Sequence, residues 1–257
     1  MKLATWNVNS LTVRLGQVED WIKKAQPDLL LLQETKQENI KFPHDAISAL
    51  GYHAIHNGQK TYNGVAIISK YELFDIQNNM PDFKDEQKRL IAATVNTDYG
   101  KIRIVCVYVP NGQSVDSDKY QYKLDWLKHF TVWLKNEMVS FPDIIIAGDF
   151  NIAPQDIDCH DPEAWKNNIL VSPKEREAFQ KIIDLGLSDN FRVINPSEIQ
   201  YSWWDYRMAG FRRNLGMRID HILTNKNITD KTTNSVIDKE PRKSERPSDH
   251  TPVVIEF

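Results

Sequence analysis

A carboxylate and an amide follow the most apolar strand-like run of the chain. Residues 143–151 read DIIIAGDFN, in which three isoleucines are typical of a buried strand. Asp149 and Asn151 follow this run two residues apart, so on an extended chain they share one face. A buried carboxylate needs a partner, so we expect the pair at the strand's open end, as a base or metal ligand beside a neutral hydrogen-bonding group. The alternative is an ordinary turn, because Gly, Asp and Asn are common turn residues.

Polar residues end several other strand-like runs in the same way. They are Asn7, Glu34, the pair Tyr108 and Asn111, Asp220, and the pair Asp249 and His250. One polar strand end carries little information. Six polar strand ends in one chain, counting Asp149 and Asn151, predict a shared cluster of polar side chains at one end of the fold.

The residue types at these strand ends favour a hard divalent cation. The oxygen donors are Glu34, Asp149 and Asp249, with Asn7 and Asn151. Such ligands suit Mg²⁺ or Mn²⁺ better than zinc, and a cation held in this way usually acts on phosphate groups. His250, with Asp220 available to orient it, would donate a hydrogen bond to a phosphate oxygen or relay a proton.

Other common kinds of site lack their motifs. The chain has neither CxxC nor HExxH, which argues against zinc, and neither GxxxxGK[ST] nor GxGxxG, which argues against a nucleotide cradle. It also lacks the GxSxG of serine hydrolases. The strand-end carboxylates are therefore the strongest catalytic signal in the sequence.

The apolar patterns predict an α/β fold. Strands are expected at 3–8, 28–34, 52–56, 64–70, 73–78, 90–97, 101–109, 143–149, 201–204, 218–225 and 250–257, with a short one at 235–238 in an otherwise loop-like segment 229–247. Helices are expected at 11–26, 43–50 and 117–139, and another begins with a capping box at residues 172–175. Asn-Gly steps between close strands indicate antiparallel hairpins. We therefore expect two packed, largely antiparallel sheets with helices outside.

The composition is that of a globular enzyme. A net charge of -3 over 257 residues argues weakly against binding nucleic acid through bulk charge but leaves room for a local basic face. No apolar run approaches the roughly 18 residues of a membrane span, and polar residues near the N-terminus interrupt any signal-peptide core. Cys106 and Cys159 lie in unlike surroundings, so no disulfide is expected and a cytoplasmic location fits.

Seven short motifs connect these observations. In order they are WNVNS (6–10), LQET (32–35), YNGVAI (62–67), YVPNG (108–112), GDFN (148–151), RIDHIL (218–223) and SDHTPV (248–253). The series resembles that of the exonuclease III family of abasic-site endonucleases, in the endonuclease/exonuclease/phosphatase superfamily, and YSWWDYR (201–207) narrows the likeness to that branch. The resemblance spans essentially the whole chain. It implies one domain, 1–257, folded like pancreatic deoxyribonuclease as a four-layer α/β sandwich.

The resemblance also implies an activity. Members of the family hydrolyse phosphodiesters of damaged duplex DNA with Mg²⁺, for which Mn²⁺ can substitute. The expected reactions are cleavage 5′ to abasic sites and the processing of blocked 3′ ends by 3′-phosphatase and 3′–5′ exonuclease action.

The family's functional residues can be matched to positions of this chain. Glu34 matches the main metal ligand, assisted by Asn7 and Asp249. Asp149 matches the residue that holds or deprotonates the attacking water, and Asn151 matches the amide that fixes that water or the transition state. Tyr108 matches a phenol that contacts phosphate, and His250 matches the imidazole that binds phosphate, oriented by Asp220. Asn9 departs from relatives that carry Asp there, which puts a second metal position in question.

A block of aromatic and basic residues would hold the DNA. Trp203 and Met217 match positions that wall the pocket for a base-less sugar. Further substrate contacts are expected from Asn111, Lys119, Lys123, Arg207 and Arg218. Without the resemblance, Trp203 would more often be a core residue and the arginines a solvated face. Loop 153–171, with Leu170, would lie near the pocket and bear on whether it admits an abasic nucleotide or only a 3′ end.

Other functions could use the same catalytic pieces. One is a specialised 3′-phosphatase or 3′-exonuclease with little incision activity. Another is a phosphatase of lipid head groups or small phosphate esters, which would need no duplex DNA. A catalytically inactive DNA-binding module fits less well, because all the polar positions are intact. No exposed apolar stripe indicates an obligate protein partner, so we expect a monomer.

Overall fold

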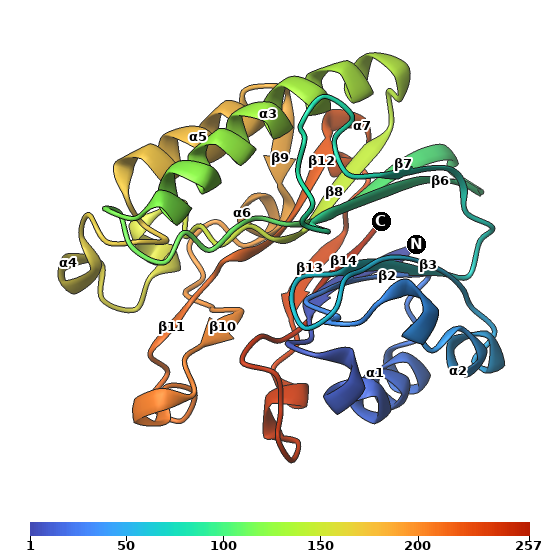
Figure 1. Cartoon of the computed structure of the whole chain (residues 1–257), viewed down its shortest axis with the longest axis horizontal. Helices are drawn as coiled ribbons and strands as arrows, with labels where there is room; N and C mark the ends of the chain where they lie inside the picture. The colour runs from blue at the N-terminus through green and yellow to red at the C-terminus, as the bar shows by residue number, and fades with distance from the viewer.

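A computed structural model describes residues 1–257 as two facing sheets with helices on their outer sides (Figure 1). The first sheet has the order β13 (Asn234–Ile237), β14 (Val253–Glu256), β1 (Lys2–Asn7), β2 (Leu29–Gln33), β4 (Val65–Ser69) and β3 (His53–Asn57). The second has the order β5 (Phe74–Asn78), β6 (Leu90–Thr97), β7 (Gly100–Tyr108), β8 (Ile144–Asp149), β12 (Asp220–Asn225) and β9 (Leu187–Asp189). Strands β1 and β2 are parallel, as are β7 and β8, and the remaining neighbours are antiparallel. The predicted four-layer α/β sandwich is confirmed.

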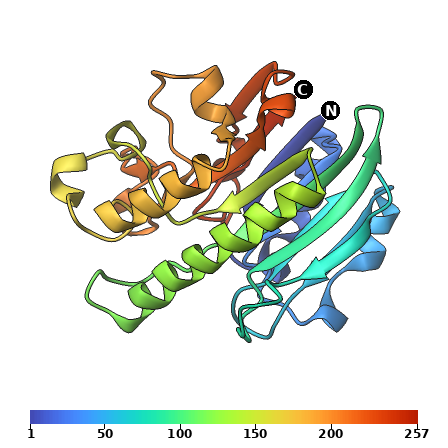
Figure 2. The same ribbon diagram turned by 90° about the horizontal axis from the view of Figure 1, so that it is seen from above.

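Helices cover both outer faces of the sandwich. They are α1 (Leu11–Ala25), α2 (His44–Ala49), α3 (Asp118–Ser140), α4 (Pro162–Trp165), α5 (Pro173–Ile183), α6 (Asn190–Ile194) and α7 (Lys226–Thr229), with single 3₁₀ turns η1 (Asn39–Lys41), η2 (Asp156–Asp158), η3 (Arg207–Ala209) and η4 (Glu240–Lys243). Helices α1 and α2 lie on the first sheet, and α3 and α5 lie on the second (Figure 1). Figure 2 shows α3 crossing the second sheet, with the two chain ends close together. None of the helices combines the length and apolarity needed to cross a bilayer.

Three apolar layers hold the sandwich together. The middle layer lies between the sheets and includes Leu31, Ile104 and Ile145. The outer layers pack each sheet against its helices, through residues such as Trp6 and Trp21 on one side, and through Trp126, Phe130 and Phe150 on the other. Because both faces of the central strands are covered, the strands are continuously apolar until their polar ends, as the sequence indicated.

Local signals account for the two long helices on the second sheet. Ser117 caps α3 by accepting a hydrogen bond from the Tyr120 backbone N–H at 3.2 Å. The predicted capping box of α5 is present, with Ser172 and Glu175 each bonding the other's backbone. The predicted spans of both helices are therefore confirmed to within about two residues.

Several boundaries in the last third of the chain differ from the prediction. The expected strand 218–225 begins two residues later, as β12, and 201–204 shortens to β10 (Trp203–Trp204). A short strand that was not predicted, β11 (Gly216–Met217), precedes β12. Strands β10 and β11 pair only with each other, as a ribbon outside both large sheets. The short strand β9 and helix α6 were not predicted, because each is too short to show a periodic pattern.

A buried ionic network fastens loop 153–171 to the second sheet. Asp158 accepts hydrogen bonds from Arg218 Nε at 2.7 Å and from Arg218 Nη2 at 3.1 Å, and it also pairs with Arg192. Arg218 Nη2 lies 2.8 Å from Asp189 Oδ2 as well. Asp158 and Arg218 are completely buried. The loop is therefore held in place by charges that cannot be exposed to water separately without a large penalty.

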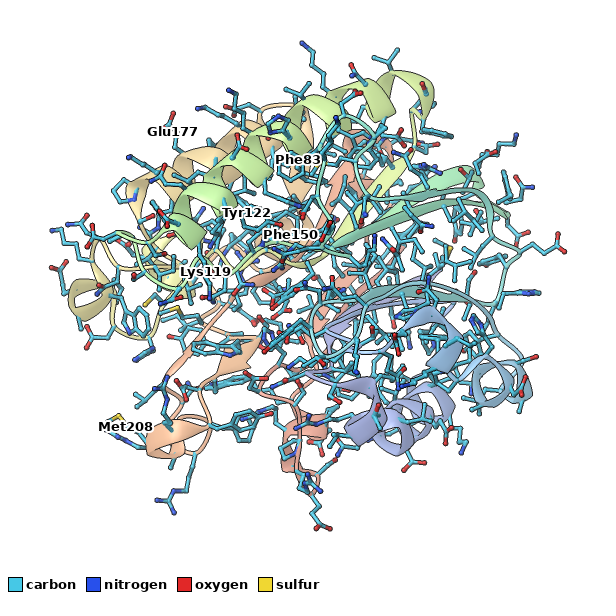
Figure 3. The ribbon with its side chains drawn as sticks, in the orientation of Figure 1. Phe83, Lys119, Tyr122, Phe150, Glu177 and Met208 are labelled. Atoms are coloured by element: carbon cyan, nitrogen blue, oxygen red, sulfur yellow. The ribbon has the colours of Figure 1, made fainter.

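Asp158→Asn should strongly destabilise the protein. The substitution leaves the buried Arg218 guanidinium and the partly exposed Arg192 guanidinium facing a neutral amide, and breaking a buried ion pair from one side typically costs about 3–5 kcal/mol. Urea unfolding measures the loss. The control is Glu177→Gln on the outer face of α5, where the side chain pairs only with exposed Lys181 (Figure 3), and no measurable change is expected. A loss below about 1 kcal/mol for Asp158→Asn would show that the network does not anchor the loop.

Candidate active site

Strands from both sheets bring the polar strand ends together. In the second sheet the register places Tyr108 opposite Asp149 and Asp149 opposite Asp220, so three neighbouring strands each contribute one polar residue. In the first sheet Asn7 ends β1 and lies opposite Gln33, which puts Glu34 just beyond the end of β2. The strand-end residues picked out in the sequence therefore meet where the two sheets face each other.

The Asn7 side chain joins the two sheets at this point. Its Nδ2 donates to Glu34 Oε1 at 2.9 Å and to Asp149 Oδ2 at 2.8 Å. Asn7 and Asp149 are almost completely buried. Two carboxylates in a buried site repel each other unless donors or cations lie between them. The Asn7 amide supplies one donor to each carboxylate and so fixes their separation.

His250 lies between two aspartates. Its Nδ1 donates to Asp220 Oδ2 at 2.9 Å, and its Nε2 lies 3.7 Å from Asp149 Oδ2. Ser202 Oγ also donates to Asp220 Oδ2, at 2.6 Å, which holds that carboxylate in position. Burial alone would lower the pKa of His250, but Asp220 and Asp149 outweigh burial and raise it above its ordinary value. The ring is therefore a charged donor at neutral pH.

Asp149 is the buried carboxylate at the centre of the cluster. Its Oδ1 accepts a hydrogen bond from the Asn151 backbone N–H at 2.8 Å. Burial raises the pKa of Asp149, and Asp220 adds to this effect, although His250 and the Asn7 amide oppose it. A carboxylate whose pKa is raised toward neutrality is suited to accept a proton.

The GDFN segment has local reasons for its glycine and its asparagine. A Cβ at Gly148 would lie 1.9 Å from the Val107 carbonyl oxygen, so any larger residue would force β7 and β8 apart. Asn151 has a φ of 51°, a left-handed conformation that asparagine tolerates better than most residues. Its Oδ1 accepts from Asn111 Nδ2 at 3.0 Å, and its Nδ2 donates to the Val109 carbonyl at 3.0 Å. Asn111 and Asn151 thus form an amide pair beside Asp149.

Tyr108 presents a protonated phenol to the same space. Burial raises the pKa of Tyr108, and the neighbouring Glu34 carboxylate raises it further, whereas Arg89 opposes both. The Arg89 guanidinium lies 4.8 Å from the centre of the Tyr108 ring. The net effect raises the pKa of Tyr108 and keeps its hydroxyl a donor at neutral pH.

The cluster fits a hard divalent cation. One potential ligand atom each from Glu34, Asp149 and His250 lies within 4.8 Å of the others. His250 is charged and hydrogen-bonded to Asp220, so the carboxylates of Glu34 and Asp149 are the available ligands. Oxygen donors of this kind suit Mg²⁺ or Mn²⁺. The Glu34 side chain is 18% exposed, which leaves the cluster open to solvent on that side.

Asp249 lies beside this cluster. Its Oδ1 accepts from Asn9 Nδ2 at 2.9 Å, and its Oδ2 accepts from Trp203 Nε1 at 3.0 Å. Lys36, which we did not select from the sequence, lies 2.9 Å from Glu34 Oε2 and also donates to Asn9 Oδ1. Its position directly after LQET was the available signal. A chain of polar contacts therefore runs from Glu34 through Lys36, Asn9 and Asp249 to Trp203.

Trp203 and Met217 lie together at one side of the cluster. They are paired across the β10–β11 ribbon, and the Trp203 ring centre is 6.5 Å from that of His250. Met217 is completely buried and packs with Cys159 and Leu170 in a small apolar group against which Trp203 also packs. Loop 153–171 therefore contacts the wall that contains Trp203, as expected.

Two basic regions flank the site. Asn111 and Lys119 line a cleft of about 600 Å³ that also includes Arg89, Tyr62 and Tyr108. On the other side, Arg207 and Met208 lie at the tip of the segment that connects β10 to β11, which projects from the body of the protein (Figure 3). The Arg207 side chain is 85% exposed and pairs with Asp205. Met208, which we did not select, is 75% exposed and has a left-handed φ of 56°.

Two predicted DNA contacts are wrong in this structure. Lys123 and Arg218 are completely buried, so neither can reach a phosphate backbone. Lys123 pairs with Glu175 between α3 and α5, and Arg218 pairs with Asp158 and Asp189. Both residues looked like surface cations because the sequence does not show that acidic partners from distant segments enclose them.

A family model matches nearly the whole chain. The model of the endonuclease/exonuclease/phosphatase family covers residues 4–250. The chain belongs to this family. The motif resemblance and the fold are in agreement with it.

Relatives within the endonuclease/exonuclease/phosphatase family match over their full lengths. The chain is 37% identical to exodeoxyribonuclease III of Haemophilus influenzae, covering all of both proteins. Among solved structures it is similar to the 3′ phosphatase NExo from Neisseria bound to a product DNA hairpin, with 45% identity, a TM-score of 0.97 and 100% and 99% of the two chains covered. An AP endonuclease from Archaeoglobus fulgidus shares 39% identity, with a TM-score of 0.95 and the same coverage. The chain is thus a metal-dependent hydrolase of the exonuclease III type.

A divalent cation should stabilise the folded protein through Glu34. An ion that binds only the folded state adds about 2.7 kcal/mol at 100 times its dissociation constant. The melting temperature should therefore rise with Mg²⁺ or Mn²⁺, and Glu34→Gln should remove most of that rise. Glu38→Gln is the control, because Glu38 is a nearby exposed carboxylate that pairs only with Lys41. An undiminished rise in Glu34→Gln would place the ion elsewhere.

Proposed function

We propose that this protein hydrolyses phosphodiesters of duplex DNA with Mg²⁺, or Mn²⁺ as a substitute, 5′ to abasic sites and at blocked 3′ ends. The observation that carries this proposal is a charged His250, held by Asp220, facing the buried carboxylate of Asp149. A cationic donor and a base on either side of a small space suit a phosphate ester attacked by water. The printed names of relatives support it, since they include an exodeoxyribonuclease, an AP endonuclease and a 3′ phosphatase bound to DNA.

Asp149 and Asn151 would act on the attacking water. Asp149 would accept the proton of the attacking water, and the Asn151 amide would hold that water or the transition state. A bound Mg²⁺ would supply Lewis-acid stabilisation of the phosphate oxygens. Glu34 would be its main ligand, with Asn7 and Asp249 assisting, and Asp149 and Asn151 would offer further oxygen donors.

The phosphate side falls to His250 and Tyr108. Charge-assisted hydrogen bonds are roughly twice as strong as neutral ones, so the imidazolium would bind a phosphate oxygen firmly. Asp220 would keep the ring oriented and charged. The Tyr108 hydroxyl would donate to the same phosphate, because its pKa keeps it protonated.

The flanking regions would hold the duplex. Trp203 would wall the pocket for the base-less sugar, with the completely buried Met217 packed behind it as support, and Asn111 and Lys119 would contact the strand on the opposite side. Arg207 would pair with backbone phosphate beyond Trp203, and Met208 would touch the groove beside it. Leu170, under Met217, would bear on the balance between internal incision and 3′-end removal.

We further propose that the protein acts in the cytoplasm, as one domain and as a monomer. Both cysteines are free and buried, which suits a reducing compartment. No step above requires a second protein.

The decisive assay uses two labelled DNAs. A duplex with one synthetic abasic site should be cut with Mg²⁺ and left intact with EDTA, and a nicked duplex ending in a 3′-phosphate should lose that phosphate. Removal of the 3′-phosphate without incision would retain the chemistry but make the assignment of the Trp203 wall wrong. Failure on both would favour a small or lipid phosphate ester, to be tested directly with such substrates.

Asp149→Asn should abolish cleavage while leaving DNA binding nearly unchanged. The amide keeps the shape of the side chain but cannot accept a proton, so turnover should fall at least about 10³-fold. The dissociation constant for the abasic duplex, measured by fluorescence anisotropy, should stay within about threefold. Retained turnover would rule out the proposed role of Asp149.

Arg207→Ala should weaken DNA binding in proportion to one lost phosphate contact. The slope of log affinity against log salt should decrease by about 1, with little dependence on sequence. Lys226→Ala is the matched control, because Lys226 is an exposed cation on α7, away from the site, where it pairs with Asp230. An unchanged slope for Arg207→Ala would mean that Arg207 does not contact a DNA phosphate.

A further inference from the structure

Lys123 and Glu175 form a buried ion pair that DNA binding does not explain. Lys123 lies on α3 and Glu175 on the first turn of α5, and both side chains are 0% exposed. Figure 2 shows these two helices side by side over the second sheet. Burial lowers the pKa of Lys123, whereas the adjacent Glu175 carboxylate raises it. Glu175 therefore favours the charged form of Lys123.

Lys123 uses its three donors on three different segments. Besides Glu175, its Nζ donates to the Asn151 carbonyl at 2.7 Å and to the Asn111 carbonyl at 3.1 Å. These are the backbones of the two residues whose side chains form the amide pair next to Asp149. The ammonium group thus holds both halves of that pair from behind.

Glu175 extends the same contacts to loop 153–171. Its Oε1 accepts from the Leu170 backbone N–H at 3.1 Å, and its Oε2 accepts from Ser172 N at 3.1 Å and Ser172 Oγ at 2.6 Å. Leu170 has a left-handed φ of 74°, which a leucine adopts only when its surroundings impose it. Leu170 in turn packs in the apolar group that contains Met217.

Fold stability alone gives no reason for this arrangement. A buried ion pair often stabilises a protein no more than apolar residues of similar size would. A capping box for α5 works equally well with glutamine at the position of Glu175. What the charges add is strong, directional hydrogen bonds to three backbone segments at once.

We infer that Lys123 and Glu175 are positioning residues for the reaction, setting the Asn111–Asn151 amide pair and Leu170 in one fixed arrangement around Asp149. This inference rests on the proposed function. A displacement of about 1 Å at a reacting centre can cost roughly 10²-fold in rate, so small movements of the two asparagines would be visible in kcat.

The test compares this pair with a second, largely buried ion pair, which joins α3 to β7. Arg103 and Glu137 pair at 2.8 Å, with side chains 2% and 14% exposed, near the opposite end of α3. Lys123→Met should lower kcat on the abasic duplex roughly 10- to 100-fold with KM changed less than about threefold. Glu137→Gln should also lower the melting temperature but leave kcat within about twofold. Rates are measured well below the melting temperature of every variant.

Two milder variants guard against a failure to fold. Ser172→Ala removes one donor to Glu175 without touching Lys123, and should lower kcat by a smaller factor. Lys123→Arg retains donors and charge, and should recover more activity than Lys123→Met. If kcat is unchanged in folded Lys123→Met and Ser172→Ala, or falls equally in Glu137→Gln, the pair is merely structural and the inference is overturned.

A readout without turnover separates this inference from the proposed function. Side-chain NH₂ resonances of Asn111 and Asn151, followed by ¹H–¹⁵N NMR, should shift in Lys123→Met and stay in place in Glu137→Gln. Inactive wild-type protein with shifted resonances would refute the proposed reaction while supporting the positioning role. Unshifted resonances would refute the positioning role whatever the wild-type activity.

Discussion

The amide of Asn7 is the contact on which the rest of the site depends. It comes from the first sheet and donates both to Glu34, on the same sheet, and to Asp149, on the other. Apolar packing brings the sheets together but has no preferred direction, whereas these two hydrogen bonds from one amide fix the positions of the two carboxylates. The opposing charge comes from His250, which belongs to neither of the strands that carry these carboxylates. Position and electrostatics are thus set by different segments that meet at one point.

The site also concentrates backbone strain. Asn9, Glu34 and Asn151 all have positive φ values, of 43°, 51° and 51°. Of these two residue types, asparagine adopts the conformation more readily than glutamate, so Glu34 is the costly case. Its surroundings compensate: the Glu34 carbonyl accepts from Ser10 N at 2.7 Å, and the next carbonyl, that of Thr35, accepts from Leu11 N at 3.1 Å. The start of α1 therefore takes its hydrogen bonds from the strained segment rather than from a side-chain cap. The start of α1 and the segment that carries Glu34 therefore stabilise each other.

Buried cations around the site show where inference from charge is weakest. Lys123, Arg218 and Arg207 are indistinguishable as charges in the sequence, and only Arg207 proves to be exposed. The acidic partners of the other two lie 52 and 60 residues away along the chain. No local pattern reports such a partner, because an isolated Lys or Arg is normally solvated. Lys36 is a different case, because its partner Glu34 lies only two residues before it in the sequence.

Residue types and periodicity alone predict the strands with their polar ends, the capped helices α3 and α5, and a cluster of oxygen donors suited to a hard cation. These features depend on periodicity and residue type within a few neighbouring positions, where local rules suffice. Only the tertiary structure decided that Tyr108, Asp149 and Asp220 lie in one row, that the β10–β11 ribbon places Trp203 beside His250, and which cations are buried. Strand register and the burial of charge are settled by contacts between distant segments, because each contact is stable only once the others have excluded water.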